Sequence, residues 1–147
     1  MARRARVTGV DVSAVALEKA ARLATERGVA VEWIRGDLVV WEPPNRYDLV
    51  VVMYLHLPSE LRRPIFTRLA HSVDHGGTML VVGHDSLNLT GGYGGPQDPS
   101  VLYGPGDVSQ DLSGVLEIER AESVRRPVET SDGTATAIDV LVRGRRV

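Results

Sequence analysis

The sequence predicts an α/β fold, with helices on both faces of a mainly parallel sheet and an antiparallel hairpin at the end of the chain. Strand-like segments alternate with segments whose apolar residues recur at helical spacing, which is typical of such sheets. Tyr47–Met53 is an apolar run that suits a central parallel strand covered on both faces. With 147 residues, 43% of them hydrophobic, the chain is long enough for one domain, residues 1–147, with its own core.

The N-terminal third predicts a strand, a helix and a second strand. The first strand is expected over Arg6–Val10, and Ser13 is a suitable N-cap for the helix that follows. Gly28 is expected to end that helix in the left-handed conformation. The second strand is Val29–Ile34. The helix is predicted from apolar residues at helical spacing, namely Leu17, Ala20, Ala21 and Ala24.

A second helix is expected after Tyr47–Met53. It is marked by a four-residue repeat of Leu61, Ile65, Leu69 and Val73. Pro64 falls inside this pattern, where proline removes a hydrogen bond and clashes with the preceding turn. We therefore expect the first turn to be irregular, or the regular helix to begin near Pro64.

The remaining elements complete the predicted sheet. A long polar loop is expected at Asp85–Gly106. Loops of this length inside a compact domain are usually functional, and often form a lid. The two last strands are expected to pair antiparallel through the turn Ser131–Gly133. In order, the segments are a turn at Pro43–Asn45, a turn at His75–Gly77, a strand at Thr78–Val82, the loop, a short helix at Asp107–Leu112, and strands at Val115–Val124 and Thr134–Val142.

Composition excludes several classes of function. The formal net charge of −2 gives no overall attraction to nucleic acid or anionic membranes, and the arginine clusters Arg3–Arg6 and Arg143–Arg146 are interpreted as solvated termini. The absence of cysteine excludes disulfides and thiolate chemistry. No His, Asp and Glu spacing matches a helix-borne metal motif, and no apolar run approaches the ~20 residues of a membrane span. A cytoplasmic protein without a metal is expected.

The segment Val7–Ser13 carries the clearest functional signal. It is a short strand that ends in the carboxylate of Asp11 and continues into a helix. Nucleotides bind beyond the carboxyl ends of the strands of open α/β sheets, and two carboxylate oxygens suit the hydroxyl pair of a ribose. The pattern predicts a nucleotide-type site. The alternative for Asp11 is a cap for the following helix, and both roles can hold together.

The order of four motifs resembles the class I S-adenosylmethionine-dependent methyltransferases. These motifs are Val7–Ser13, Gly36-Asp37-Leu38, Tyr47–Val50 and Gly76–Val82. The terminal hairpin is also similar to that family, and Gly83–Leu89 and Gly94–Pro99 resemble its small bacterial tellurite-resistance and thiopurine-type enzymes. The resemblance covers the chain from Arg6 onward. It implies a Rossmann-like sheet, S-adenosyl-L-methionine as cofactor and a small-molecule acceptor.

The resemblance also implies roles for the cofactor-binding residues. Asp11, with Val12 beside it, would hold the ribose. Asp37 would accept from the adenine amine and Leu38 would pack on the purine, although Asp37 is alternatively a turn residue. Tyr54 would lie near the transferring methyl group. Asp48 starts its strand and is interpreted as structural.

Three further residues are expected on the acceptor side. His56 follows the most buried strand and could take a proton from the acceptor, since histidine titrates near neutrality; the alternative is a packed residue. His84 and Asp85 could line the acceptor pocket or hydrogen-bond the loop backbone. Trp33 and Trp41 are expected to pack under the helices rather than stack on a ligand. His71 and His75, near a helix end, are read as structural.

The chain departs from the family in one respect. The family's first strand and glycine-rich turn are not found, and in its strand order that strand lies between Arg6–Val10 and Tyr47–Met53. Its loss should leave two unpaired edges or let those strands close up. We expect an N-terminally truncated methyltransferase domain rather than a fold completed by a partner; a homodimer stays open. The alternatives are a catalytically silent domain and a nicotinamide-dependent oxidoreductase.

Overall fold

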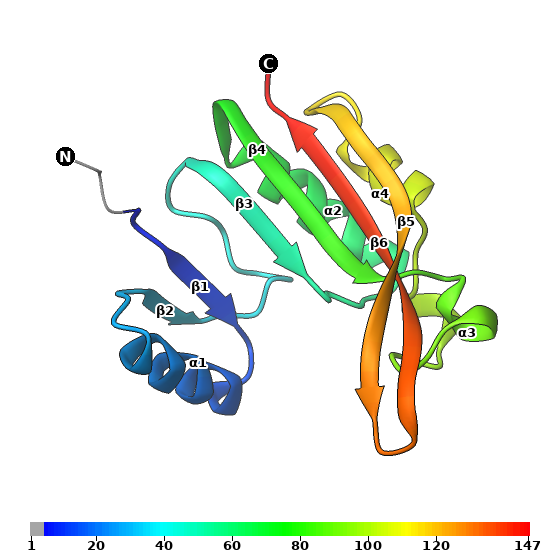
Figure 1. Cartoon of the computed structure of the whole chain (residues 1–147). Helices are drawn as coiled ribbons and strands as arrows, with labels where there is room; N and C mark the ends of the chain where they lie inside the picture. The colour runs from blue at the N-terminus through cyan, green and yellow to red at the C-terminus, as the bar shows by residue number, and fades with distance from the viewer. Residues whose placement is uncertain (1–4) are drawn as a thin grey trace. The chain divides into compact units, whose positions relative to one another are not determined.

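The computed structural model of the chain describes residues 5–147, which form two units (Figure 1). One unit is Met1–Glu42 and the other is Pro43–Val147. Arg3 and Arg4 of the N-terminal arginine cluster lie outside the described residues. That residues 1–147 act as a single domain stays a prediction.

The unit Met1–Glu42 is a strand, a helix and a parallel strand, as predicted. Strand β1 (Thr8–Asp11) pairs with β2 (Glu32–Arg35), and Asp11 lies opposite Arg35. Helix α1 (Ala14–Glu26) begins where the Ser13 hydroxyl accepts from the Ala16 N–H at 3.2 Å. It ends in a Schellman motif at Gly28, whose φ is +63°, with Gly28 bonded to Thr25 and Val29 to Ala24. Both predicted helix signals are confirmed.

The unit Pro43–Val147 contains a four-stranded sheet in the order β3-β4-β6-β5. Strands β3 and β4 are parallel, while β6 is antiparallel to both β4 and β5. The predicted hairpin is confirmed, with Ser131 and Asp132 between the paired Thr130 and Gly133. The elements are β3 (Tyr47–Met53), α2 (Ser59–His71), β4 (Val73–His84), α3 (Asn88–Gly91), the 3-10 helix η1 (Pro99–Val101), α4 (Pro105–Leu112), β5 (Glu117–Thr130) and β6 (Gly133–Arg145).

The core of this unit lies between the sheet and two helices. Helices α2 and α4 cover the same face of the sheet and contact each other (Figure 1). The opposite side of β3 presents exposed apolar side chains at Leu49, Val51 and Met53. Strands β1 and β3 are each an edge strand of their own sheet, as are β2 and β5. The buried side chains include Ile65, Phe66, Met79, Val81, Val108, Leu112, Val140 and Val142.

Two predicted boundaries are corrected. Helix α2 begins at Ser59, five residues before Pro64, so the expected delayed start near Pro64 is wrong. The side chains of Ile65 and Phe66 are almost fully buried directly after the proline, and their burial offsets the lost hydrogen bond. The predicted turn at residues 75–77 lies inside β4. There β4 shifts its register against β3, and Gly76 has a φ of +78°.

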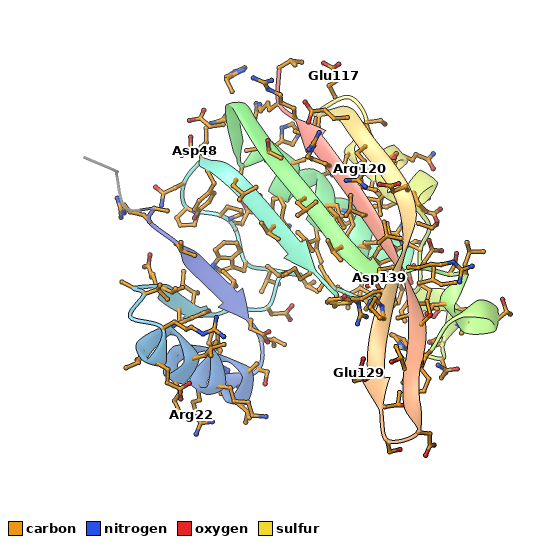
Figure 2. All side chains as sticks on the ribbon, in the orientation of Figure 1. Arg22, Asp48, Glu117, Arg120, Glu129 and Asp139 are labelled. Carbon is orange, nitrogen blue, oxygen red and sulfur yellow. The ribbon has the colours of Figure 1, made fainter. Side chains whose placement is uncertain are left out.

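The two ends of the parallel strands β3 and β4 differ in the burial of their nearby aspartates. Asp48, interpreted above as structural, is exposed at the start of β3, and Asp139 is buried on β6 opposite His84, the last residue of β4 (Figure 2). The strands β3 and β4 therefore point their carboxyl ends toward Asp139 and away from Asp48. Chemistry in this unit is expected at the Asp139 end.

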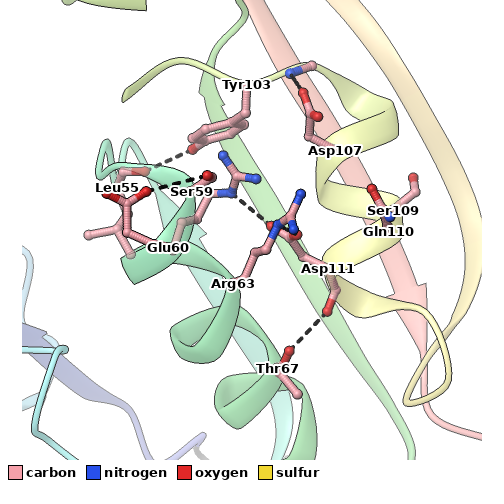
Figure 3. Close-up of polar contacts among 12 residues, drawn as sticks. Leu55, Ser59, Glu60, Arg63, Thr67, Tyr103, Asp107, Ser109, Gln110 and Asp111 are labelled. Carbon is pink, nitrogen blue, oxygen red and sulfur yellow. Dashed lines mark hydrogen bonds and ion pairs between the residues drawn. The ribbon is translucent and has the colours of Figure 1, made fainter. Parts of the chain in front are cut away.

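A buried carboxylate joins α2 to α4 (Figure 3). Asp111 accepts from Arg62 Nε at 2.8 Å and lies 3.3 Å from Arg63 Nε, while its carbonyl accepts from the Thr67 hydroxyl at 3.1 Å. The Arg62 guanidinium also lies over the Tyr103 ring, 5.0 Å from the ring centre. These contacts fix the helix pair that supports the sheet.

The prediction that the C-terminal arginine cluster is solvated is wrong for Arg146. Arg146 donates from Nη1 to the carbonyls of His71, at 2.6 Å, and Val73, at 2.9 Å. A cation at the C-terminal end of α2 satisfies carbonyls that the helix leaves unpaired. Arg146 therefore has a structural role.

Candidate functional site

The predicted acid pair lies at one edge of the β1–β2 sheet. Asp11 is the last residue of β1, and Asp37 follows β2 after Gly36. The Gly36 N–H donates to the Asp11 carbonyl at 3.0 Å, which holds the two strand ends together. Both side chains are exposed. The structure thus places Asp11 and Asp37 at the ends of neighbouring strands, and their joint role in binding stays a prediction.

Each of these carboxylates is oriented by one main-chain hydrogen bond. Asp11 Oδ1 accepts from the Ser13 N–H at 2.7 Å, and Asp37 Oδ1 accepts from the Val39 N–H at 2.9 Å. No other hydrogen bond reaches either carboxylate from the described residues, so each keeps one oxygen for a ligand. The capping and turn roles considered for these acids are therefore compatible with binding.

Apolar residues adjoin both acids in this unit, and two tryptophans pack against glycines. Val12 is 62% exposed beside Asp11, and Leu38 is half-buried beside Asp37. Trp33 lies against Gly9, where an added Cβ would come within 2.3 Å of the ring, and Trp41 lies against Gly36. Both tryptophans are half-buried against a glycine. Two exposed acids with an adjacent apolar surface can hold a diol and an aromatic ring.

A second polar cluster lies in the unit Pro43–Val147, at the carboxyl ends of β3 and β4. Tyr54 follows β3 with a φ of +54°, and it is the one non-glycine residue with positive φ among residues 5–147. Such a conformation is costly and is found most often at functional sites. It directs the Tyr54 hydroxyl to Asp139 Oδ2, at 3.0 Å. Burial and this hydrogen bond raise the pKa of Tyr54.

Asp139 is the centre of this cluster and was missed by the sequence analysis. It is only 2% exposed, yet it accepts from Arg126 Nε at 2.6 Å as well as from Tyr54. The hydrogen bond to Asp139 raises the pKa of the Arg126 guanidinium. The available signal was a single acid within an otherwise apolar strand core, Ala137–Val142. A carboxylate is buried there only if it is paired.

His56 and His84 stack on each other, with ring centres 5.3 Å apart. His56 accepts from the His84 main-chain N–H at Nε2, 3.2 Å, and its Nδ1 lies 3.2 Å from the Val101 carbonyl. The His56 ring is therefore neutral with its proton on Nδ1, and burial lowers its pKa. Both nitrogens contact the main chain, which favours a positioning role for His56 over proton transfer.

The predicted loop Asp85–Gly106 is tied to the hairpin. Asp85 is 1% exposed and accepts from the Leu87 N–H, at 2.9 Å, and from the Ser123 hydroxyl, at 2.5 Å. Asn88 accepts from the Ile138 N–H at 2.7 Å and donates to the Gly94 carbonyl at 2.7 Å. Of the two readings considered for Asp85, these contacts favour the loop-bonding one. The segment forms a fixed wall beside His84 rather than an open loop.

Tyr103 connects this segment to the residues that follow β3. Its hydroxyl donates to the Leu55 carbonyl at 3.1 Å (Figure 3), and burial raises the pKa of Tyr103 to about 12. Its ring stacks on His56 at 5.4 Å. Gly83 is required beside it, because an added Cβ would lie 2.2 Å from the Tyr103 hydroxyl oxygen.

In the part of the chain that the structure describes, none of the helices has the length and apolar character that a membrane crossing requires.

Comparison with known proteins identifies related domains. Residues 1–77 match the family model described as a methyltransferase domain. No curated protein matches the chain in sequence. The fold is similar to that of the N-methyltransferase NodS from Bradyrhizobium japonicum, at 20% identity over 96% of this chain and 73% of that chain, with a TM-score of 0.69.

Two further solved structures extend this comparison. NodS in complex with S-adenosyl-L-homocysteine is 19% identical over 96% of this chain and 66% of that chain, with a TM-score of 0.71. TehB from Haemophilus influenzae is 12% identical over 97% of this chain and 50% of that chain, with a TM-score of 0.72. At these identities the similarity shows the fold. The chain spans only half of the length of TehB.

Proposed function

Because this chain belongs to the methyltransferase-domain family, we propose that it transfers a methyl group from S-adenosyl-L-methionine to a small-molecule acceptor. The observation that carries this proposal is the acid pair Asp11 and Asp37 at the carboxyl ends of two parallel strands. Each acid keeps a carboxylate oxygen available beyond its main-chain hydrogen bond. The solved NodS complex with S-adenosyl-L-homocysteine supports the choice of cofactor.

The residues of Met1–Glu42 fit the nucleoside part of that cofactor. Asp11, next to Val12, would accept from the ribose hydroxyls. Asp37 would accept from the adenine amine, with Leu38 against the purine. When bound, the cofactor supplies a methyl group on a positively charged sulfur that is already activated for displacement. The protein then contributes mainly by holding the acceptor close and excluding water.

The acceptor-side residues belong to Pro43–Val147. His56, His84 and Asp85 are the residues expected on the acceptor side, and Tyr54 is the residue that the resemblance places near the transferring methyl group. Their contacts indicate two kinds of role. Asp85 accepts a hydrogen bond that fixes the segment after β4, and His56 accepts one from the His84 main-chain N–H. Tyr54 presents its ring beside His84, with ring centres 5.0 Å apart. We assign Asp85 and His56 to shaping the acceptor side, Tyr54 to the cofactor's methyl group, and His84 to facing the acceptor only.

Titration calorimetry with S-adenosyl-L-homocysteine tests this function. We expect the wild-type chain to bind, and Asp11→Asn to weaken binding about tenfold or more, because one charge-assisted hydrogen bond pair is lost. Asp48→Asn is the matched control, since it removes the same charge from an exposed acid at the far end of β3. Equal affinity of Asp11→Asn and wild type would refute the ribose role.

The same titration separates the competing functions. Binding of NADH without binding of S-adenosyl-L-homocysteine would replace methyl transfer with nicotinamide-dependent oxidoreduction. Binding of neither ligand would indicate a catalytically silent domain. Each of these outcomes contradicts the proposed function.

A further inference from the structure

We propose that His84 and Asp139 form a dyad that accepts a proton from the methyl acceptor, and that the acceptor's nucleophilic atom therefore carries a proton, as in an amine, a thiol or a phenol. His84 is the catalytic residue of this dyad and Asp139 is its positioning residue. The inference rests on the proposed function and names the substrate class of the same site.

Two buried polar atoms face each other at this point. His84 Nδ1 lies 3.4 Å from Asp139 Oδ1, and the two side chains are 16% and 2% exposed. Neither atom has a hydrogen-bond partner among residues 5–147. Buried polar atoms are nearly always paired, and an unpaired one has a free-energy penalty. With the His84 proton on Nδ1, that nitrogen can donate a hydrogen bond to Asp139 Oδ1. Both buried atoms then have a partner.

That tautomer leaves Nε2 of His84 with a free lone pair. When Nδ1 of a neutral imidazole is the donor, Nε2 is the acceptor. No described residue donates a hydrogen bond to Nε2, in contrast to His56, whose Nε2 is occupied by the His84 N–H. Of the two stacked rings, His84 is therefore the one that can take a proton.

The surroundings hold the Asp139 carboxyl group in place. Its Oδ2 accepts from Arg126 Nε at 2.6 Å and from the Tyr54 hydroxyl at 3.0 Å, which leaves Oδ1 for His84. A carboxylate behind an imidazole selects the tautomer and stabilises the imidazolium once it forms. The charged and titratable groups that face this pair are Tyr54, His56 and Arg126.

Gly95 fixes the His84 ring from another side. It has a φ of +78°, and an added Cβ would lie 2.8 Å from His84 Cγ and 3.0 Å from Nδ1. Gly95 therefore lies close to the His84 ring, with no space between them for a side chain. The ring stacks on His56 and tilts against Tyr54, which restricts its rotation. A base that is held in one orientation is suited to general-base catalysis.

The proposed step is balanced in atoms and electrons. The acceptor's lone pair forms the bond to the methyl carbon. The carbon–sulfur bond breaks, and its electron pair neutralises the sulfur. The acceptor's proton moves to His84 Nε2, so that the imidazole becomes an imidazolium facing the Asp139 carboxylate. The proton is then released to solvent, which regenerates neutral His84.

Nitrogen NMR of the histidine rings tests the dyad without any substrate. The chain has four histidines, so single His→Gln variants assign every ring signal. We expect neutral His84 to carry its proton on Nδ1. Asp139→Asn should weaken proton binding by His84 about tenfold or more, because an opposite charge within a few ångströms is lost.

Two variants serve as matched controls. Tyr54→Phe removes a hydrogen bond from Asp139 Oδ2 but leaves Oδ1, and should keep the His84 tautomer. Asp111→Asn removes a different buried carboxylate of the same unit, and should leave proton binding by His84 unchanged. A His84 proton on Nε2 in the wild type overturns the dyad, and so does equal proton binding in wild type and Asp139→Asn. If Asp139→Asn does not fold, the wild-type tautomer alone decides.

Ligand binding separates this inference from the proposed function. His84→Gln should bind S-adenosyl-L-homocysteine as the wild type does, while His75→Gln controls for loss of an exposed histidine. Loss of S-adenosyl-L-homocysteine binding in His84→Gln would overturn the role of His84 as a proton acceptor. If the wild type itself binds none, the proposed function fails and with it the catalytic reading of the dyad, whereas the NMR result still decides the His84–Asp139 pairing.

Discussion

Arg62 Nε donates to Asp111 Oδ2 at 2.8 Å, and the two side chains are only 3% and 1% exposed. This pair connects α2, on which Ile65, Phe66 and Leu69 are buried, to α4. Because α2 and α4 cover the same face of the sheet, the pair helps to fix the layer that supports β3 and β4. The carboxyl ends of those strands present Tyr54 and His84.

Substitution of Asp111 should destabilise the unit Pro43–Val147. Asp111→Ala leaves Arg62 buried without its partner, and breaking a buried pair in this way costs about 3 to 5 kcal/mol. Urea unfolding measures the change in the free energy of unfolding. Asp132→Ala, in the exposed hairpin turn, is the control and should change stability by less than about 0.5 kcal/mol. Equal stability of the Asp111 and Asp132 variants would contradict this view of the helix pair.

The neighbouring glycines 94 and 95 form a matched pair for the packing of His84. Both have positive φ, +72° and +78°, but an added Cβ meets open space at Gly94 and the His84 ring at Gly95. Gly94→Ala should lower the free energy of unfolding by about 1 to 2 kcal/mol, because alanine disfavours a left-handed backbone. Gly95→Ala should cost about 1 to 3 kcal/mol more and shift the His84 ring signals in NMR. The same His84 signals in both variants would be inconsistent with the described contact.

His56 should make stability depend on pH on the acid side. Burial lowers the pKa of His56 in the folded state from 6.5, so the unfolded chain binds a proton at a higher pH than the native chain does. The contribution of His56 is therefore present above the unfolded pKa and is lost as the pH falls below it. Unfolding measured at about pH 7.5 and about pH 5.5 should show a smaller loss in His56→Gln than in wild type. His75→Gln should lose as much stability as wild type.

Local signals predicted most of the fold correctly. The Ser13 cap, the Gly28 Schellman end and the hairpin turn at residues 131–133 each depend on a few adjacent residues, and the structure confirms them. The resemblance to class I methyltransferases is likewise supported by the family match. The start of α2 was predicted wrongly because the penalty for Pro64 was weighed without the burial of Ile65 and Phe66.

The two groups of candidate residues, one in each unit, differed in how far they could be predicted. Asp11 and Asp37 follow adjacent parallel strands, so their position is set by local sequence and simple topology. The cluster around Asp139 joins residues up to 85 positions apart, as in the bond from Tyr54. Such a contact depends on the register of β6 against β4, in which His84 lies opposite Asp139. No periodicity in a single sequence fixes that register.

The anchoring of the segment after β4 has a practical consequence for labelling. Asp85, Asn88 and Tyr93 bond this segment to the hairpin, while Gln97 near its tip is exposed. Because the natural chain has no cysteine, a Gln97→Cys variant would provide a unique attachment point for a fluorophore. A dye placed there would leave the hydrogen bonds of Asp85, Asn88 and Tyr93 to the hairpin intact.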